Sequence, residues 1–328
     1  MAGNGFTHLH LHTQYSLLDG AISAKKLFAR CKELGMKSVA ITDHGNLFGV
    51  VDFYTQAKAA GVKPILGIEA YIAPGSRFEK EKGSGVKGNM SHLILLAENN
   101  AGYHNLLKLS TIGFTEGFYH RPRIDKEILA ELSEGLICTT ACIGGEVPKA
   151  LIRDDWDAAR QAVKDYLEIF GSDRFFLEIQ QHANDEYPDL MGKMIELAEE
   201  MGVQLVATND VHFLNEDDFE AHDALCCINT GRKVTDPERM TYPPSVFLKS
   251  PEQMRELFAE VPRACDNTLK IAERCHVEIE LGAQHAPVYH PEDGSTPEDF
   301  LKERVYEGAK TKYGKITDEI AQRIERPA

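Results

Sequence analysis

Histidine occupies every second position of a short stretch near the N terminus, at His8, His10 and His12. Successive side chains of a strand point to opposite faces, so this spacing predicts three imidazoles on one face. Asp19 follows in the next loop. Imidazole and carboxylate groups presented together bind transition metals, whereas the alternative is the exposed polar face of an amphipathic strand. Similar residues at later strand ends favour the metal site.

The same residue types recur where later apolar runs end. In a parallel βα barrel the carboxyl ends of the strands form one active face, so such residues converge there. Single residues have structural alternatives: Glu69 could form an ion pair, Cys142 could be a small buried hydrophobe, and Asp43 is expected to cap the following helix. As a set they indicate a metal site. Its members are His10, His12, Asp19, His44, Glu69, His92, Cys142, Asp210 and His212.

The elements that must position these side chains follow a regular order. Apolar, β-branched runs predict strands, and amphipathic stretches that end at glycine predict helices between them. This βα repeat favours a parallel sheet with helices outside, and seven units indicate a closed or nearly closed α/β barrel. The predicted strands are residues 6–11, 38–42, 64–72, 93–97, 136–139, 175–179 and 203–208, and the predicted helices are 23–34, 47–60, 155–170 and 188–201.

Two features interrupt this scheme. His92 precedes its apolar run instead of following it, which indicates a distorted barrel or a misplaced strand boundary. Residues 77–89 are charged and rich in glycine, so we predict a loop near the exit of the third strand, either an inert insertion or a lid that faces a substrate.

The βα rhythm stops after Phe213. We therefore predict a metal-binding barrel over residues 1–214 and a mostly helical extension over residues 215–328 that packs on it. Residues 291–295 (P-E-D-G-S) are typical of a hinge. Helices of the extension are predicted at residues 216–229, 251–258, 263–275, 297–313 and 317–324.

The composition is that of an ordinary globular protein, with 43% hydrophobic and 27% charged residues. No apolar run approaches the length of a membrane span, and the first predicted strand leaves no room for a signal peptide. We therefore expect a cytoplasmic protein without membrane contact. The seven cysteines are scattered and odd in number, which does not fit a secreted disulfide framework.

The formal net charge of −15 excludes nucleic-acid binding by bulk electrostatics. Any contact with nucleic acid must then be local, through bound cations, or be supplied by a partner or a larger polypeptide. An excess of acidic residues also suits a cation-binding protein.

Several segments around these residues are distinctive motifs. They include H-L-H-T-Q-Y-S-L-L-D-G, I-T-D-H-G-N-L-F-G, P-I-L-G-I-E-A-Y, S-H-L-I-L-L-A-E-N, T-A-C-I-G-G-E-V and T-N-D-V-H-F, with D-P-E-R-M and N-T-L-K-I-A-E-R-C in the extension. These motifs resemble the PHP (polymerase and histidinol phosphatase) superfamily, and within it the PHP domain at the N terminus of bacterial C-family replicative DNA polymerases. The resemblance covers nearly the whole chain and implies a distorted (βα)7 barrel that holds up to three metals.

The resemblance implies a division of the nine ligands among three divalent metals. The first would be held by His10, His12, Glu69 and Asp210, the second by the bridging Glu69 with His92 and Cys142, and the third by Asp19, His44 and His212. Stand-alone phosphatases of the superfamily tend to have histidine in place of Asp19 and Cys142, which indicates the polymerase branch. The Cys142 thiolate favours zinc, with manganese or iron(II) as alternatives.

The resemblance also implies metal-dependent phosphodiester hydrolysis, in the form of a 3′→5′ proofreading exonuclease that acts on single-stranded or frayed DNA 3′ ends. Close cations suit this reaction because they activate water and neutralise phosphate charge. The candidate catalytic residues are Asp19, His44, Asp210 and Arg123. Candidate phosphate contacts are Arg121, Arg123 and His182, with plain surface positions as the alternative, and His8 is expected to be structural.

Two other functions are open at this point. One is a small-molecule phosphomonoesterase of the histidinol phosphatase kind, and the other is a non-catalytic module in which metal stabilises a polymerase and helps it dock partners. The expected partners are DNA 3′ ends, a polymerase core in the same polypeptide and other replisome subunits. No glycine-serine nucleotide-binding segment or polymerase-type Asp-x-Asp pair follows the extension. We therefore expect this chain, which ends near the expected start of that core, not to polymerise DNA alone.

Overall fold

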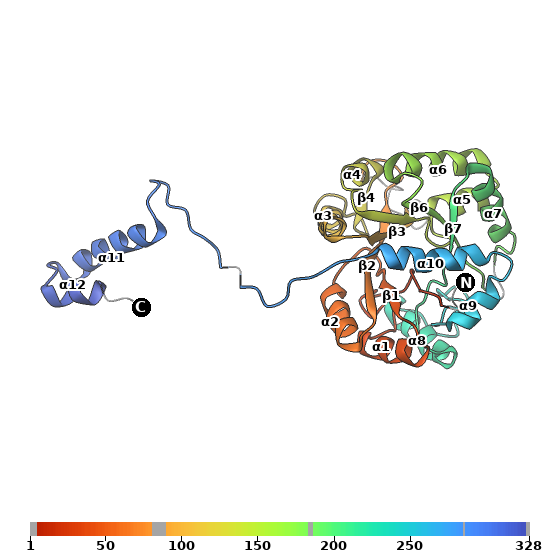
Figure 1. The fold of residues 1–328 in the computed structure, drawn as a ribbon, viewed down its shortest axis with the longest axis horizontal. Helices are drawn as coiled ribbons and strands as arrows, with labels where there is room; N and C mark the ends of the chain where they lie inside the picture. Colours follow the sequence, from red (N-terminus) through yellow and green to blue (C-terminus); the bar gives the residue numbers. More distant parts are fainter. Residues whose placement is uncertain (1–4, 81–89, 183–185, 285, 326–328) are drawn as a thin grey trace. The chain divides into compact units, whose positions relative to one another are not determined.

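The computed structural model describes residues 5–80, 90–182, 186–284 and 286–325. It forms two compact units, Met1–Ile279 and Glu280–Ala328 (Figure 1). The predicted division between residues 214 and 215 falls inside the first unit. Residues 81–89 of the predicted loop lie outside the described residues. In the part of the chain that is described, no helix is long and apolar enough to cross a membrane.

The first unit is built around a seven-stranded mixed sheet (Figure 1). Neighbouring strands follow the order β1-β2-β3-β5-β6-β7, and β4 pairs with β2. The predicted strands from residue 38 onward are confirmed, whereas the very short β4 has no apolar run to signal it. The strands are β1 (Ser38–Ile41), β2 (Lys63–Ile72), β3 (Ser91–Ala97), β4 (Arg123–Ile124), β5 (Leu136–Thr139), β6 (Phe175–Ile179) and β7 (Gln204–Ala207).

Strand β3 corrects the prediction of an all-parallel sheet. It runs antiparallel to β2 and to β5, whereas the pairs β1–β2, β5–β6 and β6–β7 are parallel. The N-terminal end of β3 therefore lies at the same edge as the C-terminal ends of its neighbours. His92 stands at that N-terminal end, paired with Tyr71. It reaches the common edge because of the direction of β3, although it precedes its apolar run.

Residues 6–11 do not form a regular strand, which corrects the first strand prediction. The amides of Ala40 and Thr42 donate to the carbonyls of His8 and Leu11, both at 2.9 Å. The segment thus advances three residues while β1 advances two, which is a bulge. On its other side the segment pairs with the chain beyond β7. It joins the two edges of the curled sheet and so completes a distorted barrel, as predicted.

Helices cover the outside of the sheet, and left-handed glycines such as Gly61 and Gly202 end two of them. The predicted helices are confirmed with small shifts at their ends, whereas α3, α4 and α5 were not predicted. The helices of the first unit are α1 (Ala24–Glu33), α2 (Val50–Ala60), α3 (Asn100–Thr115), α4 (Lys126–Glu131), α5 (Glu146–Ile152), α6 (Trp156–Phe170), α7 (Leu190–Met201), the 3-10 helix η1 (Glu216–Asp218), α8 (Phe219–Thr230), α9 (Pro251–Leu257) and α10 (Pro262–Arg274).

The strands place two different layers of side chains inside the barrel. Residues two or four apart in a strand share one face, so one strand can contribute to both layers. We call the first the apolar layer; it is formed by the buried residues Ile65, Leu96, Ile137, Phe176 and Val206, and helix α10 adds Ile271 to it. We call the second the polar layer; on the same strand faces it comprises Glu69, His92, Thr139, Glu178 and Thr208.

The second unit contains α11 (Pro297–Tyr313) and α12 (Asp318–Ile324), both as predicted. Thr296 caps α11 by accepting a hydrogen bond from the Asp299 amide. Lys302 and Tyr306 of α11 each donate to the carboxylate of Glu325, which ties the two helices together. Neither helix has a buried side chain among its described residues.

Candidate metal centre

The nine predicted ligands lie in one connected cluster at the common edge of the strands. Three groups within it have ligand atoms that all lie within 4.8 Å of one another. Asp210 and Asp19 join these groups through close contacts with histidines. The groups are His10 with His12 and Glu69, Glu69 with His92 and Cys142, and His12 with His44 and His212.

Glu69 links the groups because its two oxygens face different imidazoles. Its Oε1 lies 3.3 Å from Nε2 of His10 and 3.1 Å from Nδ1 of His92. Its Oε2 forms an ion pair with Nδ1 of His44. Glu69 is fully buried in β2, where the backbone of Asp43 and Gly45 holds it by two hydrogen bonds. A carboxylate placed in this way is suited to bridge two cations.

His10 and His12 approach each other and Asp210. Their Nε2 atoms are 3.1 Å apart, and each lies 3.1 Å from Oδ1 of Asp210. Behind them, Nδ1 of His10 lies 2.7 Å from Oε1 of Glu178, and Nδ1 of His12 lies 3.0 Å from Oγ of Ser16. Metal-binding histidines are usually oriented by such a second contact, which here leaves both Nε2 atoms facing the cluster.

His92 and Cys142 come from neighbouring segments. Sγ of Cys142 lies 3.8 Å from Nδ1 of His92 and 3.9 Å from Oε1 of Glu69. The His92 amide donates to the Gly144 carbonyl at 2.8 Å, which holds β3 against the loop after β5. A Cβ at Gly144 would lie only 2.6 Å from the His92 ring. Glycine is therefore required for this approach.

The third group is a stack of imidazoles. The His12 ring centroid lies 4.0 Å from that of His44 and 4.4 Å from that of His212. Oδ1 of Asp19 is 3.2 Å from Nε2 of His44, and the Tyr242 hydroxyl donates to the other Asp19 oxygen at 2.7 Å. The structure thus adds His12 to the three residues that the resemblance implies for the third metal.

The backbone around Asp210 brings two ligands from one short segment into the cluster. Asp210 has a left-handed conformation, with φ of 47°. Its carbonyl accepts a hydrogen bond from Nδ1 of His212 at 2.8 Å. Aspartate tolerates this region better than most residues, and non-glycine residues that adopt it often lie at functional sites.

Asp43 does not cap the following helix, which corrects that prediction. The N-cap of α2 is Gly49. The Asp43 carboxylate instead accepts hydrogen bonds from the amide and hydroxyl of Thr13 and from the hydroxyl of Ser16, at 2.7 to 2.8 Å. It therefore fixes the turn between His12 and Asp19.

Neighbouring charges set the protonation of the cluster. Burial opposes a charge on His10, but the carboxylates of Asp210 and Glu178 outweigh it and raise the His10 pKa well above its ordinary value. Burial likewise opposes ionisation of Glu69, yet its histidine neighbours hold the Glu69 pKa well below the usual range. Burial, reinforced by the carboxylates, raises the pKa of the Cys142 thiol well above normal. The ionised carboxylates would therefore favour a bound cation, for which Cys142 could serve as a further ligand once its thiol had lost the proton.

Three ligand atoms of the cluster test whether the residues fit metals. Oδ1 of Asp19, Oδ1 of Asp210 and Nε2 of His212 are buried and make no well-aligned hydrogen bond among the described residues, although the two carboxylate oxygens lie 3.1 to 3.2 Å from histidine nitrogens. Such unpaired atoms are costly, and bound divalent cations would satisfy all three. The donor set of nitrogen, oxygen and one sulfur suits zinc better than magnesium or calcium. The residues therefore fit a metal centre.

The two candidate arginines have different surroundings. Arg123 is fully buried, and its guanidinium donates to the carbonyls of Gly117 and Glu79 at 3.0 and 2.8 Å. These bonds hold the local backbone. Arg121 instead lies over the ring of Tyr71, 5.8 Å from its centroid, and this tyrosine contacts both His44 and His92. Arg121 is therefore the arginine beside the cluster.

The two remaining histidine candidates lie at its margin. Nε2 of His8 hydrogen-bonds to the Lys249 carbonyl at 2.9 Å, in keeping with a structural role. Nδ1 of His182 lies 3.2 Å from Oγ of Ser245, and His182 lines a small cavity together with Cys142.

Three residues of the centre were not predicted from the sequence. Glu178 accepts hydrogen bonds from the hydroxyls of Thr139 and Thr208 as well as contacting His10, and its signal is an acid within the apolar run F-F-L-E-I. Tyr242 and His222 hold Asp19 by contacts across 223 and 203 positions of the chain. No local pattern announces contacts between segments so far apart.

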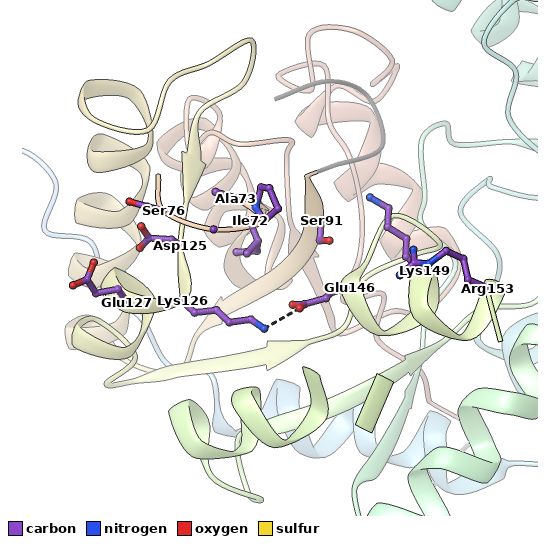
Figure 2. Close-up of a pocket in the computed structure, with 12 residues that line it drawn as sticks. Ile72, Ala73, Ser76, Ser91, Asp125, Lys126, Glu127, Glu146, Lys149 and Arg153 are labelled. Atoms are coloured by element: carbon purple, nitrogen blue, oxygen red, sulfur yellow. Dashed lines mark hydrogen bonds and ion pairs between the residues drawn. The ribbon is translucent and has the colours of Figure 1, made fainter. Parts of the chain in front are cut away.

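A large cavity of about 730 Å³ lies near the same edge of the sheet, and Figure 2 shows residues that line it. Ile72 and Ser91 line it and pair with each other, directly beside the pair of Tyr71 and His92. Adjacent residues of a strand point to opposite faces, so this cavity faces away from the metal cluster. Charged residues of both signs line it (Figure 2), and it is separate from the metal centre.

The distorted barrel and its cluster of histidines, acids and a cysteine agree with a comparison of protein families. The family model of the PHP domain matches residues 8–182. The chain belongs to this family, which confirms the resemblance inferred from its motifs.

Its curated relatives are alpha subunits of bacterial DNA polymerase III. The chain is 44% identical to the DNA polymerase III subunit alpha of Borreliella burgdorferi, over 97% of this chain and 28% of that protein. It is 41% identical to that of Thermus aquaticus, over 98% of this chain and 27% of that protein. The chain thus spans less than a third of the length of these relatives. Among solved structures, a two-domain protein from Bacteroides vulgatus containing a predicted PHP-like metal-dependent phosphoesterase matches 85% of this chain and 72% of that chain, with 12% identity and a TM-score of 0.40.

Proposed function

We propose that this chain is the PHP region of a replicative DNA polymerase and hydrolyses phosphodiesters as a metal-dependent 3′→5′ proofreading exonuclease. The observation that carries the proposal is the placement of Glu69, whose two oxygens face separate groups of metal-ligand atoms. Close divalent cations, when bound, activate water and stabilise the charge of a reacting phosphodiester. The similarity to DNA polymerase III subunit alpha supports DNA as the substrate.

The protein's own residues would orient the metal ligands and bind the substrate. Glu178 fixes the ring of His10, and Tyr242 holds one oxygen of Asp19 so that the other remains in the cluster. Arg121, in place of the buried Arg123, is the residue we propose for binding the substrate phosphate, because guanidinium matches the geometry of phosphate oxygens.

The proposal extends to the cofactors, the partners and the setting. Zinc is the proposed cation because the Cys142 sulfur is a soft ligand, with manganese or iron(II) as alternatives. The proposed partners are single-stranded or frayed DNA 3′ ends, a polymerase core in the same polypeptide and other replisome subunits in the cytoplasm. The barrel over residues 1–214 would carry the chemistry, and the extension over residues 215–328 would lead toward that core.

The direct test is hydrolysis of a single-stranded oligonucleotide by the chain supplied with zinc or manganese. A 5′ label should give a ladder of shortening products, and a 3′ label should give only the labelled mononucleotide. Chelator should stop both. His12→Ala and Asp210→Asn should abolish cleavage with the circular dichroism spectrum unchanged, whereas Asp217→Asn, an exposed aspartate near the same segment, should cleave normally.

Other outcomes would replace the proposal. Efficient cleavage of a phosphomonoester such as histidinol phosphate, with DNA untouched, would assign the chain to the phosphatases. If elemental analysis shows more than one metal equivalent per chain and neither substrate is hydrolysed, the non-catalytic module is the function that remains.

A further inference from the structure

Three phenylalanines lie exposed and adjacent on the first unit. Phe48, Phe114 and Phe118 expose 58%, 40% and 48% of their surface. Their ring centroids are 5.8 Å apart between Phe48 and Phe114, and 6.2 Å apart between Phe114 and Phe118. We call these three side chains the phenylalanine row. Exposed hydrophobic residues on protein surfaces are usually scattered singly. Several exposed aromatic side chains in contact with one another therefore indicate an interaction site.

The row borders the open side of the metal centre. His92, His44 and Asp210 expose 27%, 15% and 13% of their side chains and Cys142 is partly exposed, whereas His10 and Glu69 are fully buried. The open side of the centre therefore includes the rings of His92 and His44. Phe48 follows His44 in the same loop. Asn46 ties that loop together, donating to the His44 carbonyl at 2.9 Å and accepting from the Phe48 amide at 3.0 Å.

The end of α3 brings the rest of the row to the same place. A Cβ at Gly113 would lie 3.4 Å from Pro122, and one at Gly45 would lie 2.8 Å from the same proline. The helix end and the loop that carries His44 therefore share a contact. Phe114 follows Gly113 directly, and Arg121, which precedes Pro122, lies over the tyrosine ring that touches both exposed histidines.

We propose that the phenylalanine row binds the bases of single-stranded nucleic acid while the metal centre engages the phosphodiester at its 3′ end. This inference rests on the proposed function and names the form of substrate that the site selects. Bases stack on aromatic side chains without regard to sequence. With a net charge of −15 the chain cannot bind a strand mainly through its phosphates. Base stacking must therefore contribute much of the binding free energy. Bases inside a duplex stack on one another, so the row favours a frayed end.

A protein partner is the other occupant that an exposed aromatic surface could take. The geometry favours bases, because the rings of Phe114 and Phe118 are within 18° of parallel and offer aligned faces to flat bases.

The test compares binding of two short, 5′-labelled single strands to the whole chain by fluorescence anisotropy, in chelator so that neither is hydrolysed. One is oligothymidylate, and the other has the same backbone without bases. Phe114→Leu and Phe118→Leu keep an apolar side chain but remove the flat ring. Each should raise the Kd for oligothymidylate about tenfold and leave the base-free strand unaffected. Tyr313→Leu, at a tyrosine that is 57% exposed in the second unit, is the matched control and should change neither Kd.

Three results would overturn the inference: unchanged binding of oligothymidylate, equal weakening on both strands, or intact DNA binding with altered self-association on size-exclusion chromatography. The last would assign the row to a protein contact. Hydrolysis of methyl 4-nitrophenyl phosphate by metal-loaded protein separates this inference from the proposed function. If the small diester is not cleaved, the proposed function fails while the binding comparison still decides the row. If it is cleaved equally by native and variant chains, the variants act on binding alone, as expected.

Discussion

The two layers inside the barrel come from the same strands and differ in polarity. Strand β6 contributes Phe176 to the apolar layer and Glu178 to the polar layer, and β2 contributes Ile65 and Glu69. These four side chains are at most 3% exposed. A step of two residues in β6, roughly 7 Å, or of four residues in β2 separates hydrocarbon from a layer of polar and charged groups. Depth in the protein therefore does not decide which residue type is tolerated.

The difference lies in what each layer needs from its neighbours. Apolar side chains gain about 25 cal/mol for each Å² removed from water and require no partner. Buried carboxylates and imidazoles lose their hydration, and mutual pairing offsets that loss only in part. Pairing is indeed incomplete among the candidate ligands that adjoin the polar layer, since Oδ1 of Asp19 and Oδ1 of Asp210 make no well-aligned hydrogen bond among the described residues. The apolar layer thus stabilises the fold, whereas the polar layer is better explained by the metal ions that we propose it helps to bind.

The largest effect should come from the residue that joins the ligand groups. Glu69→Gln keeps the shape of the side chain but removes its charge and one acceptor oxygen, so we expect hydrolysis of DNA to fall by about 10³-fold or more. Steady-state assays and metal analysis of the same sample measure it, and the metal content should fall as well. Glu273→Gln, at an exposed glutamate on α10, is the control. Full metal content and activity in Glu69→Gln would remove its bridging role.

The apolar layer should respond in stability instead of activity. Phe176→Ala deletes a ring that is 3% exposed, so the free energy of unfolding should fall by about 3 to 5 kcal/mol. Urea titration measures this, and the folded fraction should bind as much metal as the native chain. Phe78→Ala, at a ring that is 57% exposed, should cost about 0.5 kcal/mol or less. A large loss of metal from folded Phe176→Ala would show that the layers are coupled.

The sequence carries different amounts of information about the two layers. The clustering of the nine candidate ligands could be predicted because their residue types are rare at strand ends and recur there together. The direction of β3 could not, because alternation of apolar residues is the same in parallel and antiparallel strands. The one sign of the antiparallel direction of β3 in the sequence is that His92 precedes its apolar run. The bulge between residues 6–11 and β1 was likewise hidden, because it depends on pairing and not on residue type.

Contacts behind the ligands were the least predictable part. Arg121 and Arg123 are two positions apart in Y-H-R-P-R, and nothing local indicates that Arg123 is buried by backbone carbonyls while Arg121 lies beside Tyr71. Tyr242 comes from a proline-rich segment whose course depends on tertiary packing. Glu178 was detectable in principle, because an acid on the inner face of an apolar strand needs a partner.

Glu178 should give a smaller effect than Glu69, since it orients a ligand and is not one of the nine. Glu178→Gln weakens the contact with Nδ1 of His10, so we expect metal affinity or activity to fall about 10- to 100-fold. Competition with a chelator measures the affinity, and the ladder of products should keep its pattern. An effect as large as that of Glu69→Gln would mean that Glu178 belongs among the ligands.

His8 is a buried histidine of the barrel that does not belong to any of the candidate ligand groups. It is fully buried, and its Nδ1 has no hydrogen-bond partner among the described residues. Burial lowers its pKa from 6.5 to about 4, against the hydrogen bond to the Lys249 carbonyl. The folded state therefore binds fewer protons than the unfolded state between these values. The stability that neutral His8 permits is present above the unfolded pKa and is lost as the pH falls through this window.

We therefore expect the free energy of unfolding to fall by about 1 to 2 kcal/mol more in the native chain than in His8→Gln when the pH drops from about 7 to 5. Glutamine can still donate to the Lys249 carbonyl but does not titrate. Urea titrations in chelator remove the contribution of bound metal, and protonation of the ligands is common to both proteins, so it cancels in the difference. Equal pH slopes would show that folded His8 accepts a proton readily. His8 would then behave as a member of the polar layer, and that layer would extend beyond the candidate ligand groups.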